Sequence, residues 1–416
     1  MLAAGLVCGV VLAAAIVVLL IRGGTGHADL VQGQPQARTT PDPGVAAVDL
    51  LTGLQNGLRR QDRAEVLAAA DSRDAAARKQ LTAVVDNVRA LRIRQLALRY
   101  VDTSDVALSP AQQERYGADA WVADVRVTWR LAGVDPAPST VDVPVVLGRH
   151  GGRVAYEGAL DAGHDQVPLW LLDRLVVRRT HDTLVVAPDR ASADRAGREA
   201  VTAVATVRRT LPGWDGPLVV EVPAGMRQFQ VSADMAPEDA RAIAAVTTTT
   251  DGSAARTAPV HVYLNPPVFD SLGPQGRQIV LSHEATHVAL GAATTSMPLW
   301  LSEGTADYVA LAHSTVPVRT LASQIRALVR KDGPPAGLPG RPEFSGANHD
   351  IGAWYEASWL AARLIAAQHG PAALLRFYRA AGHDGSTGPA FRTVLHTTQH
   401  AFAREWRAEL VGLAGS

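Results

Sequence analysis

The stretch that decides the fold is His283-Glu284-Ala285-Thr286-His287, followed after a short connection by Trp300-Leu301-Ser302-Glu303-Gly304-Thr305-Ala306-Asp307-Tyr308. Residues four apart on an α-helix lie on one face, because one turn takes about 3.6 residues. His283 and His287 can therefore bind one metal ion from a single helix. Glu303 can supply a third ligand from a following helix. The stretch predicts a metal centre built by two consecutive helices.

Glycine and proline residues mark the ends of these two helices. Gly273-Pro274 precedes and Gly291 follows a helix expected at residues 277–290, and a second helix is expected at residues 298–313. On the second helix Glu303 and Asp307 are four apart and share a face. Asp307 can accept a hydrogen bond from the second ring nitrogen of a ligating histidine, which would fix the tautomer of that histidine.

The residue types favour zinc and hydrolysis. Neutral imidazoles suit zinc, and three protein ligands leave a fourth position for water. The pKa of such a water can fall to about 7. Glu284 would take the proton of the water and pass it to a leaving amine. We expect one zinc ion per chain, bound by His283, His287 and Glu303, and hydrolysis of peptide bonds; the alternative is a zinc site without turnover.

The same residues carry a resemblance to a known family. His283-Glu284-x-x-His287 with Pro298-x-Trp300-Leu301-x-Glu303-Gly304-x-Ala306-x-Tyr308 resembles the gluzincin metallopeptidases, specifically the peptidase-MA-like group related to the aminopeptidase branch. The resemblance covers about residues 170–416, and residues 402–406 resemble the terminal helix of the family. It implies a zincin-type domain in which Tyr355 stabilises the tetrahedral oxyanion. The alternative for Tyr355 is a core or hydrogen-bonding tyrosine.

The chain departs from the classical aminopeptidases in two ways. The Gly-Ala-Met-Glu-Asn run that holds the free amine of a substrate is absent upstream of His283, and only 15 residues separate His287 from Glu303. Endopeptidase and exopeptidase action both stay open. Residues 260–264 are expected to form an edge strand that can pair with an extended peptide. A Gly/Pro-rich stretch at residues 332–346 could overhang the cleft or form an ordinary surface loop.

Periodicity predicts the fold class as α+β. Upstream of the metal motif, strands are expected at residues 175–177, 183–188, 218–223 and 260–264, with a helix at 191–211. This mixed sheet leads into a mostly helical lobe, and the whole forms a domain at residues 166–416. His261, His313 and His349 are expected to be surface or structural residues and not ligands, and Tyr308 is expected to pack.

A separate domain is expected at residues 46–165. Helices end near residue 94, with Asp62 as a cap, and residues 121–130 alternate apolar and polar side chains as in a strand with one buried face. Helices followed by a curved antiparallel sheet resemble the small α+β cone of cystatin-like and polyketide-cyclase-like domains. This domain shows no catalytic constellation. It is interpreted as a spacer or docking module, with a hydrophobic ligand cup as the alternative.

The N-terminus carries a membrane signal. Residues 2–21 are almost all apolar, which is long enough to cross a bilayer core of about 30 Å. We expect a single-pass anchor at residues 1–22 and a flexible linker at 23–45; a cleaved signal peptide is the alternative. The only cysteine, Cys8, lies in this segment, which excludes disulfides from the rest of the chain.

These observations define the expected location and partners. The chain has 40 basic and 40 acidic residues, so its net charge is near zero. It contains no basic stripe of the kind that would indicate nucleic-acid binding. We expect a cell-membrane protein with its C-terminal bulk extracytoplasmic and a peptide or protein substrate. The rival hypothesis is a catalytically silent binding or assembly protein of the cell envelope that acts through its cone domain.

Overall fold

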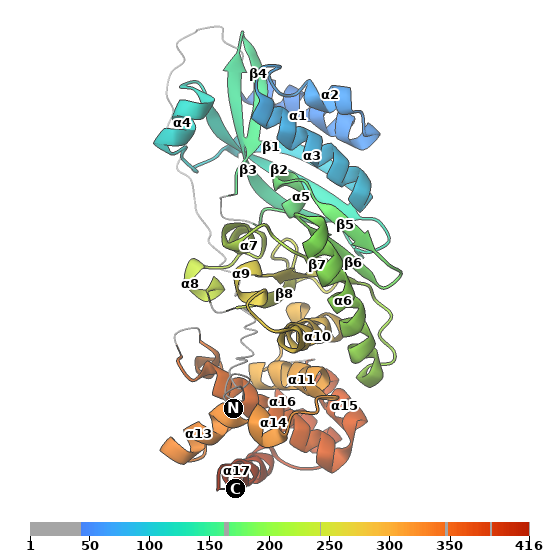
Figure 1. The fold of residues 1–416 in the computed structure, drawn as a ribbon, viewed down its shortest axis with the longest axis vertical. Coiled ribbons are helices and arrows are strands. Elements are labelled where there is room, and N and C mark those ends of the chain that lie inside the picture. The colour runs from blue at the N-terminus through green and yellow to red at the C-terminus, as the bar shows by residue number, and fades with distance from the viewer. Residues whose placement is uncertain (1–42, 162–165, 242, 346–347, 383–384, 416) are drawn as a thin grey trace, which may run out of the picture. The chain divides into compact units, whose positions relative to one another are not determined.

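The computed structural model describes residues 43–161, 166–241, 243–345, 348–382 and 385–415 (Figure 1). Contacts divide this part of the chain into two compact units. The N-terminal unit extends to Gly133 and resumes at Pro138–Arg174, whereas the C-terminal unit comprises Val134–Ala137 and the chain from Leu175 onward. Each unit combines helices with a β-sheet, so the predicted mixed α+β class is confirmed.

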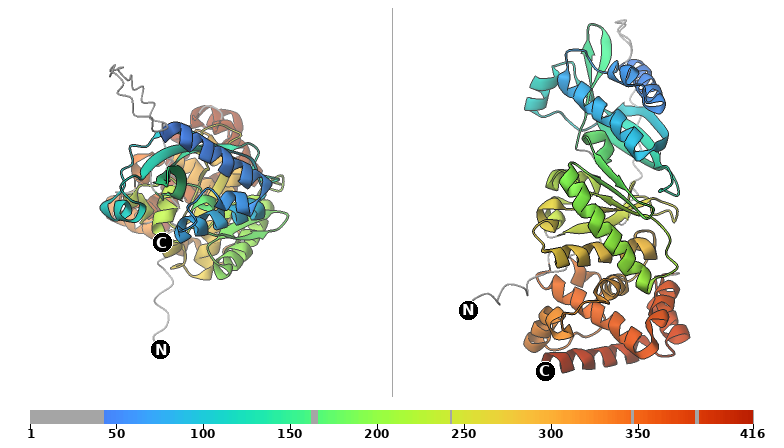
Figure 2. Two further views of the ribbon diagram at one scale, coloured as in Figure 1. Left: turned by 90° about the horizontal axis from the view of Figure 1, so that it is seen from above. Right: turned by 45° about the vertical axis from the view of Figure 1, so that its right-hand side comes forward.

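The N-terminal unit is a four-stranded antiparallel sheet with helices on it. The strands pair in the order β1-β2-β3-β4 and are β1 (Ile93–Thr103), β2 (Trp121–Leu131), β3 (Ser139–His150) and β4 (Arg153–Ala159). The helices are α1 (Pro43–Arg60), α2 (Arg63–Leu67), α3 (Ala75–Leu91), α4 (Pro110–Tyr116) and α5 (Leu169–Leu172). Figure 2 shows α1 and α3 lying along the sheet.

Local sequence explains these elements. Asp62 caps α2 by accepting hydrogen bonds from the backbone amides of Ala64 and Glu65, as expected from its position. In β2, Val125, Val127 and Trp129 are buried, and Arg126 between them is exposed, which is the period of a strand with one covered face. The predicted strand at 121–130 is therefore confirmed.

The C-terminal unit is built on a five-stranded mixed sheet. The strand order is β5-β6-β7-β9-β8. The central strands β6, β7 and β9 run parallel, and the edge strands β5 and β8 run antiparallel to their neighbours. The strands are β5 (Val176–Arg179), β6 (Thr183–Ala187), β7 (Leu218–Glu221), β8 (Ala245–Thr249) and β9 (Val260–Leu264).

Helices cover both faces of this sheet. On one face α6 (Arg190–Thr210) and α10 (Pro274–Leu290) pack against each other and on the strands (Figure 1). Small and branched apolar side chains such as Ala200, Val204 and Val262 fill this layer. The other face is covered by α7 (Met226–Ser232) and α8 (Pro237–Ala240), where Phe229 packs with Tyr263.

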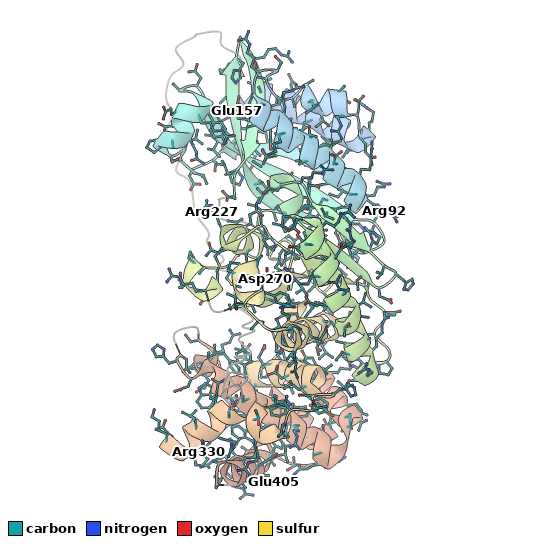
Figure 3. All side chains as sticks on the ribbon, in the orientation of Figure 1. Arg92, Glu157, Arg227, Asp270, Arg330 and Glu405 are labelled. Carbon is teal, nitrogen blue, oxygen red and sulfur yellow. The ribbon has the colours of Figure 1, made fainter. Side chains whose placement is uncertain are left out.

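The chain past α10 is almost wholly helical, as predicted. Its helices are α11 (Leu299–Leu311), α12 (Val318–Leu321), α13 (Ser323–Asp332), α14 (Ile351–His369), α15 (Pro371–Ala381), α16 (Thr387–Val394) and α17 (Gln399–Gly415). Two short 3-10 helices are η1 (Ala292–Thr294) and η2 (Pro342–Phe344), and the short helix α9 (Pro266–Phe269) precedes α10. Trp300, Phe377, Phe391 and Phe402 meet in one core cluster. Arg330 of α13, labelled in Figure 3, donates to the carbonyl of Ala414 at the end of α17.

Three sequence-based expectations are corrected. Residues 260–264 form β9, which lies between β7 and β8, so the predicted edge strand is an inner strand and β8 is the edge. Helix α1 begins at Pro43, so the last residues of the predicted linker are helical; proline suits the first turn because no partner is needed for its missing N–H. Strands β1 and β8 were not predicted.

The predicted anchor at 1–22 and the linker residues up to 42 lie outside the described residues. Among the residues that the structure describes, no helix is long and apolar enough to cross a membrane.

Candidate metal centre

Helix α10 presents the two histidines of the motif. Its first turn contains Pro274, and it ends at Gly291, whose φ of 67° is the left-handed conformation that glycine adopts at helix ends. His283 and His287 lie one turn apart, with ring centroids separated by 4.6 Å. Both side chains are fully buried. The predicted helix thus forms, and both imidazoles point to the same place.

Glu303 of α11 completes a three-residue group. Its Oε2 lies 3.2 Å from His283 Nε2 and 3.4 Å from His287 Nε2. The two Nε2 atoms are 2.9 Å apart. All three ligating atoms therefore converge on one point, and all three side chains are buried. This group could bind a metal ion.

Asp307 contacts His283 on the ring nitrogen that faces away from the three-residue group. Its Oδ1 lies 2.7 Å from His283 Nδ1, so the N–H of that ring nitrogen donates to the carboxylate. The proton is thereby fixed on Nδ1, and Nε2 keeps a lone pair for a metal. The predicted role of Asp307 beside a ligating histidine has a matching geometry. His287 differs, because its Nδ1 is buried without a hydrogen-bond partner.

The buried charges depend on one another. Burial opposes the charge on Glu303, but the neighbouring imidazoles His287 and His283 outweigh it and lower the pKa of Glu303 to about 2. Burial likewise opposes protonation of His283, yet the carboxylates of Asp307 and Glu303 hold the pKa of His283 well above its usual range. The imidazoles and the carboxylates of the group thus shift each other's pKa values in opposite directions.

The donor set fits a metal ion. Two imidazole nitrogens and one carboxylate oxygen are ligands that suit zinc and other first-row divalent ions. Two imidazole nitrogens at 2.9 Å with a carboxylate oxygen beside them form a closely spaced set of lone pairs that a cation stabilises. The second oxygen of Glu303, Oε1, is also buried without a partner. A divalent ion would satisfy these groups.

Gly304 brings a third helix to the site. A Cβ atom on Gly304 would lie 2.2 Å from the carbonyl oxygen of Ser358 in α14, so only glycine permits this approach of α11 and α14. The approach positions Tyr355, one turn earlier on α14, near the acidic residues of the site.

The side chain of Tyr355 is buried. Burial raises the pKa of this phenol well above 10, and the charges of Glu303, Asp307 and Glu284 act in the same direction. Tyr355 is therefore a neutral hydrogen-bond donor at neutral pH. Phe344 of η2, which belongs to the Gly/Pro-rich stretch, packs edge-on against its ring with centroids 5.3 Å apart.

Glu284 has a partner that sequence reasoning missed. The hydroxyl of Thr247 in β8 lies 2.6 Å from Glu284 Oε2. Glu284 Oε1 is buried without a partner. No sequence signal connects Thr247 to the motif, because 37 positions separate Thr247 from Glu284.

Among the described residues, His261, His313 and His349 lie outside the metal group, as predicted. His261 is buried, with Nδ1 at 2.6 Å from Glu221 Oε1 and Nε2 at 3.1 Å from Asp135 Oδ1, so both ring nitrogens are occupied. His313 and His349 are exposed. Tyr308 is half-buried and packs between the two main core clusters of this unit.

Comparison with known proteins does not extend this description. No protein-family model matches the chain, and no curated protein matches it. The function must therefore be inferred from the residues of the site.

Proposed function

We propose that the chain is a zinc metallopeptidase of gluzincin type, anchored in the cell membrane with its C-terminal bulk extracytoplasmic. The observation that carries the proposal is the convergence of His283, His287 and Glu303, with Glu284 next to the first histidine. A structural site would not require a carboxylate in that position with a free oxygen. The N-terminal apolar run supports the location.

The donor set supports zinc as the ion. Three protein ligands, two of them histidines on one helix, are typical of catalytic zinc, in which one position stays open. Zinc bound there would polarise a peptide carbonyl and lower the pKa of a water molecule. Asp307 keeps His283 in the tautomer that can ligate.

The side chains around the ligands have the chemistry that hydrolysis needs. Glu284 would take a proton from the attacking water and deliver it to the leaving nitrogen, as the C–N bond breaks. Both protons of the water end on the amine, and its oxygen ends in the new carboxylate. Tyr355, a neutral phenol near the site, would donate to the oxyanion that develops on the carbonyl.

Strand β8 offers a place for the substrate backbone. At one end of β8, the amide of Asn265 donates a hydrogen bond to the carbonyl of Ala244. At the other end, the amide of Thr250 donates to the carbonyl of Pro259, so both bonds continue the pairing of β8 with β9. In an antiparallel ladder, every second residue directs its N–H and C=O groups away from the partner strand. In β8 these are the odd-numbered residues. Ala245 and Thr247 therefore direct these groups away from β9, toward the outer edge of the sheet, which is the side on which we place an extended peptide.

The folds of the two units agree with the proposal in outline. A mixed sheet with an active-site helix on one face, followed by a helical lobe, is the arrangement expected of a zincin-type domain. The helices and antiparallel sheet of the N-terminal unit agree with a cystatin-like cone. We assign the N-terminal unit a spacer or docking role, since the metal group lies wholly in the C-terminal unit.

A peptide-library digest tests the proposal. The full-length chain, purified in detergent and loaded with one equivalent of zinc, is incubated with peptides of mixed length and sequence, beside a chelator-treated sample. We expect zinc-dependent cleavage, and the positions of the cuts will distinguish endopeptidase from exopeptidase action. Absence of cleavage by the zinc-loaded chain would contradict the proposal and favour the silent binding protein.

A further inference from the structure

Thr247 and Glu284 form a buried pair between the edge strand and the motif helix. The hydroxyl oxygen of Thr247 is 2.6 Å from Glu284 Oε2 and 3.2 Å from the backbone carbonyl oxygen of Glu284. A hydroxyl has a single proton, and the shorter contact to a charged acceptor is the stronger one. Thr247 therefore donates to the carboxylate. Both residues are at most 2% exposed, so water does not compete for this bond.

The two oxygens of Glu284 are thus unequal. Oε2 accepts from Thr247, whereas Oε1 is buried and has no hydrogen-bond partner. A buried carboxylate oxygen without a donor is costly unless a ligand or water supplies one. Oε1 is therefore the oxygen available to a water molecule at the metal centre. The hydrogen bond at Oε2 fixes the carboxylate plane and with it the direction of Oε1.

We infer that Thr247 is a positioning residue that holds Glu284 in the orientation needed to accept a proton through Oε1. The inference rests on the proposed role of Glu284 as general base. It assigns β8 two functions: its backbone edge faces the substrate, and its Thr247 side chain orients the base. Substrate pairing and base orientation would thereby be coupled through one residue of the strand.

The geometry makes a specific demand on the side chain at position 247. Valine has nearly the shape of threonine but no hydroxyl, whereas serine keeps the hydroxyl and loses only a methyl group. Thr247→Val should lower kcat by about 10- to 100-fold, the effect expected for loss of a charge-assisted hydrogen bond. The KM should change less than about twofold, because the backbone groups of β8 are unaltered. Thr247→Ser should recover most of the lost kcat.

Thr183→Val is the matched control. Thr183 is a buried strand threonine of the same sheet, in β6, and its hydroxyl forms a side-chain hydrogen bond with Thr180 at 2.9 Å. Its substitution also removes a hydroxyl and one hydrogen bond, but away from the metal centre. We expect this variant to keep the wild-type kcat and zinc content.

The experiment measures kcat, KM, zinc content and structure for the zinc-loaded full-length chain and the three variants. In a crystal structure of Thr247→Val we expect the Glu284 carboxylate to leave the rotamer in which Oε2 faces residue 247, and in Thr247→Ser to keep it. Either an unchanged kcat or an unchanged Glu284 rotamer in Thr247→Val, with zinc retained, would overturn the inference.

The structural readout keeps this inference separable from the proposed function. If the wild-type chain hydrolyses no peptide, the proposed function fails, and so does the catalytic purpose of the pair. If Glu284→Gln abolishes hydrolysis but Thr247→Val retains the wild-type kcat, the proposed function stands and only the role of Thr247 is wrong.

Discussion

Asp307 Oδ1 lies 2.7 Å from His283 Nδ1, and both side chains are buried. The two residues come from consecutive helices, and the bond fixes which ring nitrogen of His283 is free to ligate. The metal centre thus depends on the packing of α10 against α11, while Gly304 permits the close approach of α14 to α11.

Replacing the Asp307 carboxylate, which accepts the hydrogen bond from His283, by a neutral group is expected to lower the affinity for zinc. Asp307→Asn keeps the size of the side chain but weakens its hold on the N–H of His283. We expect zinc affinity, measured by competition with a chelator of known strength, to fall by about 10- to 100-fold. Asp332→Asn, at an exposed aspartate that ends α13, is the control and should bind zinc as the wild type does. An affinity within twofold of wild type in Asp307→Asn would contradict this role.

Tyr355 is predicted to act on the reaction and not on the metal. Tyr355→Phe removes only the hydroxyl, and burial keeps the ring in place. We expect kcat to fall by about 100- to 1,000-fold, the effect of losing one oxyanion donor, with zinc content unchanged. Tyr308→Phe, at a half-buried packing tyrosine of α11, serves as control. Equal kcat values for Tyr355→Phe and wild type would make Tyr355 a packing residue only.

Gly304 is predicted to tolerate no side chain. A Cβ at 2.2 Å from the Ser358 carbonyl oxygen must push α11 and α14 apart, so Gly304→Ala should destabilise the C-terminal unit by about 1–3 kcal/mol or more. Thermal unfolding with and without zinc measures the effect. Gly412→Ala is the matched control, since nothing lies within 4 Å of its added methyl group, and alanine favours helix α17 by up to about 1 kcal/mol. Equal melting temperatures for the two variants would refute the close contact.

The protonation of His261 is expected to make the stability of the folded chain depend on pH. Burial opposes its charge, but hydrogen bonds to Asp135 and Glu221 prevail and raise the pKa of His261 to about 9. The pKa in the folded chain is above the unfolded value of about 6.5, so protonated His261 stabilises the fold fully below pH 6.5. This contribution, at most about 3 kcal/mol, is lost as pH rises through about 9.

The comparison with His261→Gln tests that contribution, which comes from His261 together with its partners Asp135 and Glu221. Tyr263 packs beside His261 with ring centroids 6.4 Å apart, and it stays neutral across this range because burial raises its pKa well above 10. We expect the melting temperature of the wild type to exceed that of the variant at pH 6 and the difference to shrink by pH 9.5. A difference independent of pH would show that His261 is uncharged in the folded chain.

The sequence was most informative where one pattern fixes geometry. Two histidines one turn apart and a glutamate four residues from an aspartate determine faces of helices, so His283, His287, Glu303 and Asp307 could be predicted together. The alternation in β2 likewise predicted a strand with one buried face. In both cases the period of the element decides which side chains share a face.

Elements that break a pattern could not be predicted. In β1 the register shifts between Arg94 and Ala97, where Gln95 has a φ of 53°, so the alternation is interrupted by a bulge. Strand β8, Ala245-Val246-Thr247-Thr248-Thr249, shows no alternation of apolar and polar side chains, and its absence from the prediction made β9 the expected edge. The contacts of Thr247 with Glu284 and of Phe344 with Tyr355 join distant segments, and only the folded chain shows them.

The measurement that tests the central claim most directly compares the full-length wild type with Glu284→Gln. Both are loaded with zinc, assayed for metal content, and incubated with a peptide that the wild type cleaves. Glutamine keeps the shape of the side chain but cannot serve as a base, and no ligand is removed. We predict one zinc per chain in both proteins and a kcat at least about 100-fold lower in the variant. Hydrolysis at the wild-type rate by zinc-loaded Glu284→Gln would contradict the account.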